Sequence, residues 1–277
     1  MIAAMTELVV RRLLIDLESP FERRWNGGDA FRTAFANALS MSFPAGEQYF
    51  IDAVRMGLKA LPEADRARFA AEVQGFVGQE ATHRRIHALF NEQLERQGFV
   101  NAWEARIKER QRRMAEAGFD ARHWVAATAA TEHFTAILAD WMLRHPRWLD
   151  DVEPRLATMW RWHASEESEH RSTAFDLYLA LGGNHRWRVR WMRMVTWYFA
   201  TDLARQTVSN LARDGALWRW STWRSAWHYL FGREGLVRHT WKPWRRYFRT
   251  DFHPAQQDGS PGRDWLAANQ DAFTPVR

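Results

Sequence analysis

The chain has 277 residues, of which 46% are hydrophobic, and a formal net charge of +6. This length can supply one sizeable core, with or without a smaller appendage. Because the chain contains no cysteine, structural disulfides and thiolate metal sites are excluded, and any metal must bind His and carboxylate side chains. Iron, manganese and zinc suit such a ligand set.

The N-terminal stretch MIAAMTELVVRRLLIDLESP carries an early acidic residue and has two arginines inside its apolar run. A secretory signal instead begins with basic residues, followed by an uninterrupted apolar segment. We therefore expect a cytoplasmic protein. Residues 1–34 are predicted to form a short N-terminal helix and a loop around the turn sequence Asn26-Gly27-Gly28-Asp29.

Apolar residues recur mostly at helical spacing, and the alternation typical of strands is rare. Pro44 interrupts the first predicted helix, so that helix either kinks there or begins there. The polar, highly charged stretch 99–119 is predicted to be a solvated crossover helix. Four long helices are predicted, at residues 35–61, 63–97, 120–144 and 150–181.

These four helices carry carboxylates and imidazoles at matched spacing. The first and third each carry one glutamate, within FPAGEQYF and ATEHF, and the second and fourth each carry Glu-x-x-His, within GQEATHRRIH and HASEESEHR. The lone glutamate precedes the motif by 33 residues in the first half and by 35 in the second, which suggests two related helical hairpins. The residues concerned are Glu47, Glu80, His83, Glu132, Glu167 and His170.

Positions three apart share one face of a helix, so the Glu and the His of each motif can reach one metal ion. Together the four helices offer four carboxylates and two imidazoles, the set used by ferritin-like di-iron and di-manganese proteins. Four carboxylates offset the charge of two divalent cations, and burying them without metal would be costly. We therefore predict an all-α fold with a ferritin-like four-helix bundle at residues 35–183. It would hold two metal ions per chain, iron first, with manganese or zinc as alternatives.

Neighbouring residues leave some assignments open. Glu166 and Glu169 could replace Glu167 if the helix were rotated, but only Glu167 has a histidine three residues later. His87 and His163 lie one turn from the motifs, so each could be an added ligand or a hydrogen-bond donor to a ligating carboxylate. A polar residue near the end of the bundle is the simpler interpretation of both.

Four segments, FPAGEQYFIDAVR, QEATHRRIH, ATEHFTAIL and WHASEESEHRSTAFDLY, resemble a bacterial family of predicted metal-dependent hydrolases, as does RRYFRTDFHP further on. The likeness covers about residues 35–255. The ligand pattern of that family is similar to that of the ferritin-like di-iron superfamily, and it implies the same six residues as metal ligands. Hydrolysis itself does not follow from them, because the chain has neither HExxH nor a serine or cysteine triad pattern.

Three functions compete. A carboxylate-rich site with two histidines is typical of iron that activates dioxygen. The first expectation is therefore an O2-dependent oxidase, oxygenase or desaturase acting on a small hydrophobic, lipid-like substrate, with an electron donor as partner and the six residues as its catalytic set. The alternative is a metal-dependent hydrolase in which two metals activate water. The third is a non-catalytic metal-binding or membrane-associated interaction protein.

The part at 184–254 is predicted to be a basic, Trp/Arg-rich helical extension, with helices at 186–212 and 217–231 and then a basic loop. Residues 184–253 contain 14 of the 39 Lys and Arg residues, 4 of the 33 acidic residues and nine of the 17 tryptophans. The remainder, 255–277, is predicted to be an extended tail.

Trp and Arg together suit the interface of an anionic membrane. We therefore expect peripheral association with the inner face of the membrane. The alternative is that these tryptophans pack back onto the bundle. Nucleic acid is disfavoured as a partner because no recognised nucleic-acid motif is present, and the sequence leaves a homodimer open.

Overall fold

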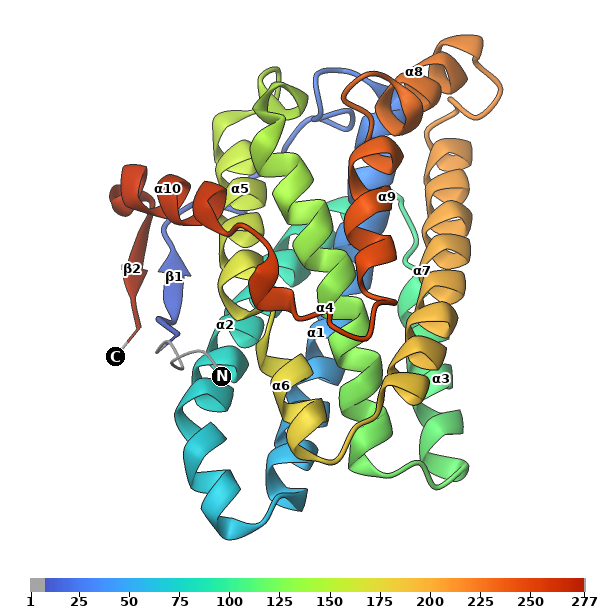
Figure 1. The fold of residues 1–277 in the computed structure, drawn as a ribbon. Helices are drawn as coiled ribbons and strands as arrows, with labels where there is room; N and C mark the ends of the chain where they lie inside the picture. Colours follow the sequence, from blue (N-terminus) through green and yellow to red (C-terminus); the bar gives the residue numbers. More distant parts are fainter. Residues whose placement is uncertain (1–7, 277) are drawn as a thin grey trace.

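The computed structural model describes residues 8–276, and nearly all of its regular structure is helical (Figure 1). The long helices are α1 (Ala30–Ala60), α2 (Glu63–Arg96), α4 (Ala121–Arg144), α5 (Pro154–His170) and α7 (His185–Arg213). The shorter ones are α3 (Trp103–Glu116), α6 (Thr173–Ala180), α8 (Trp220–Phe231), α9 (Leu236–Arg246) and α10 (Ser260–Ala268). Two short strands, β1 (Arg11–Leu13) and β2 (Phe273–Pro275), pair antiparallel. The prediction of an all-α chain is confirmed, apart from this small ribbon.

Helices α1, α2, α4 and α5 form the centre of the molecule. Helix α1 packs along both α2 and α4, and α4 packs along α5. Helix α3 crosses from α2 to α4 and buries only Trp103, so the predicted solvated crossover is confirmed. Helices α7, α8 and α9 lie on one side of this centre, and α10 with the two strands lies on the other (Figure 1).

Pro44 lies inside α1, which begins five residues earlier than predicted and is assigned as one helix through the proline. Proline has no backbone N–H, so the carbonyl of Ser40, one turn earlier, loses its helical hydrogen bond. The side chain of Asn91 on α2 replaces it by donating from Nδ2 to that carbonyl over 2.9 Å. Asn91, on a neighbouring helix, therefore satisfies the carbonyl that Pro44 leaves without its helical partner, and the helix does not begin at the proline.

The fourth predicted helix is divided in the structure, because α5 ends at His170 and α6 begins at Thr173. In an unbroken helix the carbonyl of Ser168 would accept a hydrogen bond from the backbone of Ser172. The guanidinium of Arg171 donates to that carbonyl instead, and also to the carbonyls of Pro254 and Gln257 in the C-terminal segment. Arg171, the residue that directly follows α5, thus fixes the turn.

Both ends of the described chain differ from the predictions. Residues 8–29 contain strand β1 and no helix, and residues 1–7 of the predicted N-terminal helix lie outside the described part. The turn before α1 is confirmed: Gly27 and Gly28 adopt φ of +58° and +70°, and Asp29 caps the helix. The predicted extended tail instead contains α10 and β2, and the predicted basic loop contains α9.

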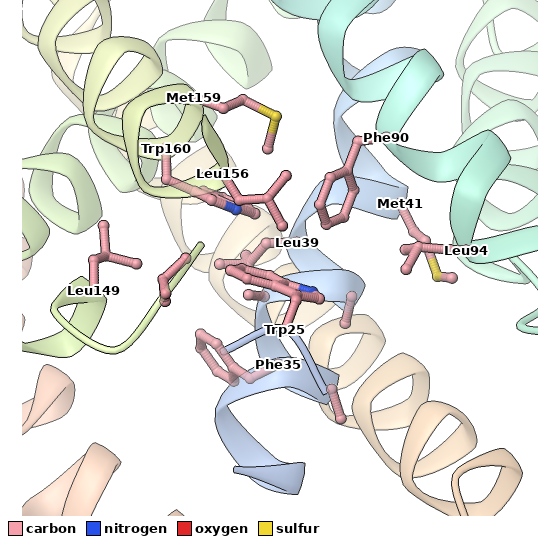
Figure 2. Close-up of a cluster of buried hydrophobic side chains, with 14 of the residues drawn as sticks. Trp25, Phe35, Leu39, Met41, Phe90, Leu94, Leu149, Leu156, Met159 and Trp160 are labelled. Atoms are coloured by element: carbon pink, nitrogen blue, oxygen red, sulfur yellow. The ribbon is translucent and has the colours of Figure 1, made fainter. Parts of the chain in front are cut away.

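Two apolar clusters fill the bundle, one toward each end. The first contains Trp25, Phe35, Leu39, Met41, Phe90, Leu94, Leu149, Leu156, Met159 and Trp160 (Figure 2). The second contains Tyr49, Phe50, Val54, Phe69, Phe76, Val125, Phe175 and Tyr178. Each of the four chain segments crosses from one cluster to the other, between Met41 and Tyr49, Val77 and Ile86, Ala130 and Trp141, and Trp162 and Ala174. Those four crossings contain all six predicted ligands.

No helix within residues 8–276 is long and apolar enough to span a membrane.

The replacement of a backbone hydrogen bond by Asn91 is testable. We expect Asn91→Ala to lower the free energy of unfolding by about 1–3 kcal/mol, because the buried Ser40 carbonyl loses its partner. Adding Pro44→Ala should recover part of that loss, since position 44 then has a backbone N–H. Urea denaturation of the metal-free proteins measures both changes, and no recovery in the double variant would contradict the explanation.

Candidate metal centre

The structure brings all six sequence-predicted residues into the layer between the two apolar clusters. Their side chains come from four elements, α1, α2, α4 and α5, in the order that the spacing predicts. None is more than 4% exposed. The set is Glu47 on α1, Glu80 and His83 on α2, Glu132 on α4, and Glu167 and His170 on α5.

Two overlapping groups of these residues have the geometry of a metal site. In each group every residue offers one nitrogen or oxygen, and these atoms all lie within 4.8 Å of one another. Both groups contain His83. The first is Glu80, His83, Glu167 and His170, and the second is Glu47, His83 and His163.

Each of the two motif histidines forms a hydrogen bond with a carboxylate through the ring nitrogen that faces away from the centre. His83 donates from Nε2 to Glu166 over 2.9 Å, which turns Nδ1 toward Glu167 at 3.7 Å. His170 donates from Nδ1 to Glu132 over 2.8 Å, which turns Nε2 toward Glu80 at 3.4 Å. Carboxylates commonly orient metal-binding histidines in this way, because they fix the tautomer and the ring plane.

Glu132 therefore differs from the other predicted ligands. It belongs to neither geometric group, and its Oε2 accepts the hydrogen bond from His170. Its Oε1 is buried and has no hydrogen-bond partner.

Many buried nitrogen and oxygen atoms of this layer have no hydrogen-bond partner in the protein, as expected for atoms that bind a metal ion. Such atoms are rare in proteins, because leaving one unsatisfied costs about 1–3 kcal/mol or more when the group is charged. Here they include both ring nitrogens that face the centre, Nδ1 of His83 and Nε2 of His170. They also include both carboxylate oxygens of Glu47 and of Glu80, and one oxygen each of Glu132 and Glu167. This donor set, all nitrogen and carboxylate oxygen, fits a divalent metal such as zinc, manganese or iron.

A chain of hydrogen bonds assigns the tautomer of His163. The Asn91 amide donates to the Ser40 carbonyl, so its oxygen accepts from the Ser40 hydroxyl over 2.8 Å. That hydroxyl must then accept from Nδ1 of His87 (2.9 Å), which leaves Nε2 of His87 to accept from Nδ1 of His163 (2.7 Å). Nε2 of His163 faces the centre, where it forms a hydrogen bond of 2.8 Å with Glu167 and lies 3.9 Å from Glu47.

His163 is thus a candidate third imidazole ligand, whereas the ring nitrogens of His87 form hydrogen bonds with His163 and Ser40. The sequence placed both on the correct helix faces and favoured a simple polar role for each. The helical spacing could not distinguish them, because the hydrogen bond that fixes His87 comes from Ser40 on another helix, α1.

Arg11 closes the centre on the side of the two-stranded ribbon. Its guanidinium pairs with Glu166 at 3.0 Å and with Glu169 at 2.7 Å. The chain just before Arg11 lies so close to α2 that a Cβ on Gly78 would lie 2.3 Å from Val10. No signal in the sequence linked Arg11 to the site, since 155 residues separate it from Glu166.

The electrostatics follow from burying many carboxylates together. Burial and the charges of neighbouring glutamates raise the pKa of Glu47 and of Glu80 well above the ordinary value. Burial raises the pKa of Glu132 to about 7, against the opposing effect of His170. Burial lowers the pKa of His170, but the charges of Glu132 and Glu167 outweigh it and raise that pKa to about 9. Perturbation of this kind is common at functional sites.

A family model described as "Predicted metal-dependent hydrolase" matches residues 9–258. The chain belongs to this family. The match contains every residue of the two groups and also Arg11, and it confirms the resemblance seen in the sequence. No curated protein and no solved structure matches the chain. The ferritin-like assignment of the bundle therefore stays a prediction, as do the number and identity of the metal ions.

The pair formed by Glu166 and His83 allows a matched test. We expect Glu166→Gln to weaken metal binding about 10- to 100-fold, because the carboxylate no longer orients His83. Glu169→Gln changes a carboxylate that contacts the same arginine but no histidine, so it should leave affinity nearly unchanged. Competitive titration with a chromophoric chelator measures both, and equal losses in the two variants would contradict the assignment.

The metal-free protein should lose stability as pH rises from about 6.5 to 9. Glu47, Glu80, Glu132 and Glu166 have raised pKa values, so the folded state keeps protons that unfolded carboxyls release near pH 4. The raised pKa of His170 acts in the same direction, since its stabilisation is lost as pH passes about 9. Folding thus binds protons, and stability falls with pH. The lowered pKa of His83 opposes this trend only below about 6.5.

Thermal unfolding at several pH values, with and without chelator, tests this prediction. The melting temperature of the chelated protein should fall across that range. The metal-loaded protein should show a smaller fall, because metal replaces the protons. A chelated protein that becomes more stable between pH 6.5 and 9 would show that the buried carboxylates are not protonated.

Proposed function

We propose that this chain is a metal-dependent hydrolase whose centre holds two divalent metal ions between α1, α2, α4 and α5. The observation that carries the proposal is the convergence of unpartnered nitrogens and carboxylate oxygens in one buried layer. Family membership supports hydrolysis as the reaction class. It gives no support to the oxidase that the sequence placed first.

The two geometric groups supply the ligands. Glu80, His170 and Glu167 would hold one ion, and Glu47, His83 and His163 the other. The four carboxylates of the layer offset the charge of two divalent ions, which explains how so many acids can be buried together. Bound divalent metal would lower the pKa of a water molecule and polarise the bond to be cleaved.

The proposal gives Glu132 a different role from the ligands. Its Oε2 holds His170 in place, and its Oε1 has no partner in the protein. We assign Oε1 as the acceptor of the proton that the attacking water releases, the task of a general base. The apolar clusters on both sides keep bulk water away and favour a small hydrophobic substrate, such as an ester with apolar groups.

Metal content and turnover should separate these roles. The wild-type protein, stripped with chelator and reloaded, should bind about two zinc or manganese ions per chain. It should then hydrolyse members of a panel of chromogenic esters, amides and phosphate esters in the absence of oxygen. Glu132→Gln should weaken metal binding about 10- to 100-fold, as Glu166→Gln does, because the carboxylate that orients His170 is lost. At saturating metal it should still hold both ions while turnover falls about 100- to 10,000-fold, the usual contribution of a general base. Glu80→Gln, by contrast, should lose metal.

The outcomes have distinct meanings. Failure of Glu132→Gln to hold two ions even at saturating metal would make Glu132 a ligand and would leave hydrolysis standing. Consumption of oxygen by the iron-loaded protein, with no hydrolysis by any metal form, would restore the oxidative alternative. Failure of the wild-type protein to bind metal would remove the proposed centre altogether.

A further inference from the structure

Six tryptophans are exposed on the described chain, and all of them lie in the region of α7, α8 and α9. Two are almost fully accessible, Trp218 at 92% and Trp220 at 80%. The set, called here the Trp face, is Trp197, Trp218, Trp220, Trp223, Trp227 and Trp241. Such large side chains are normally buried at least in part, so a cluster of this size marks a contact surface.

In helix α8, the spacing of the tryptophans along the sequence accounts for their exposure. Trp220, Trp223 and Trp227 follow one another at three- and four-residue spacing and therefore share one helix face. That face is turned outward, and the opposite face is buried through Ala226 and Tyr229. The alternative, in which these tryptophans pack back onto the bundle, therefore does not hold for the six that form the Trp face.

The Trp face continues from α9 to α7. Trp241 on α9 stacks on Trp244 with ring centroids 5.0 Å apart. The indole of Trp244 donates to Thr196 on α7 over 3.0 Å, beside the exposed Trp197. The three helices lie on the same side of the bundle, opposite the two-stranded ribbon (Figure 1).

Within residues 186–250, which carry the Trp face, every exposed charge is positive. The acids between residues 186 and 250 are Asp202, Asp214 and Glu234, and none is exposed. Arginines of other segments already pair with all three. The exposed basic residues among the tryptophans are therefore uncompensated, and they include Arg193, Arg219, Arg224, Arg238 and Lys242.

We propose that the Trp face binds the surface of an anionic lipid bilayer. Indole rings settle at the depth of the lipid headgroups, with the polar N–H toward water, and arginine pairs with lipid phosphate. A second copy of the chain is a poor occupant, because a twofold contact would set like charges against each other. This inference does not depend on the proposed hydrolase function, because no ligand of the metal centre belongs to the surface.

Co-sedimentation with vesicles tests the proposal on the full-length, metal-loaded protein. We expect binding to phosphatidylglycerol vesicles at low salt and little binding to phosphatidylcholine vesicles. Salt near 1 M, where the screening length is about 3 Å, should release most of the protein. Brominated lipids should quench tryptophan fluorescence, because the rings reach headgroup depth.

Two double variants separate the contribution of the arginines to membrane binding from that of the tryptophans. Arg219→Ala/Arg224→Ala should lower the partition coefficient about 25-fold, at about fivefold for each charge near the surface. Trp220→Ala/Trp227→Ala should remove most of the quenching. Arg55→Ala/Arg68→Ala changes two exposed arginines outside the Trp face and should bind as the wild type does. Unchanged melting temperature and metal content will show that each variant is folded.

Three results would overturn the proposal. One is no binding to anionic vesicles at low salt, or binding that all the variants leave unchanged. Another is a stable dimer in analytical ultracentrifugation that Trp220→Ala/Trp227→Ala dissociates, which would make the surface a protein interface. The third is tight binding to single-stranded nucleic acid, lost in the arginine variant, by a protein that ignores vesicles.

Discussion

The burial of five carboxylates in one layer of the bundle, those of Glu166 and of the four predicted glutamate ligands, is the constraint on which the rest of the structure depends. An ionised carboxylate in an apolar interior is unstable unless it is protonated, paired or bound to metal. The chain meets this requirement by placing every acid of the layer beside an imidazole or by leaving its oxygens free for a cation. The apolar clusters above and below the layer then form two separate cores rather than one.

This arrangement explains which parts of the site could be read from the sequence. The ligand spacing is a local property, because residues three apart share a helix face whatever the helix packs against. Glu80 with His83, and Glu167 with His170, could therefore be chosen from the pattern alone. The support of His83 by Glu166 could not, because it joins two helices whose relative rotation is set by packing. The role of Arg11 depends on the pairing of two strands from opposite ends of the described chain.

The same distinction holds for the fold. The helices α2, α4 and α7 were predicted to within a few residues, since turn signals flank them. Helix α9 was predicted as a loop because Pro243 and many charges interrupt its pattern. Tertiary contacts stabilise it nonetheless, since the Pro243 carbonyl accepts from His133 on α4 and Trp244 bonds to α7. Propensity is a weak guide where such contacts dominate.

Strand β2 is synthesised late, and its partner β1 carries Arg11, which lies beside the metal centre. Phe273 follows His170 by 103 positions, so a ribosome adding about 5–20 residues per second makes β2 about 5–20 s after the last ligand. During that interval the four bundle helices can assemble, while β1 still lacks its partner strand and Arg11 its anchored position. All six predicted ligands are therefore synthesised before the strand that pairs with β1, the strand that carries Arg11.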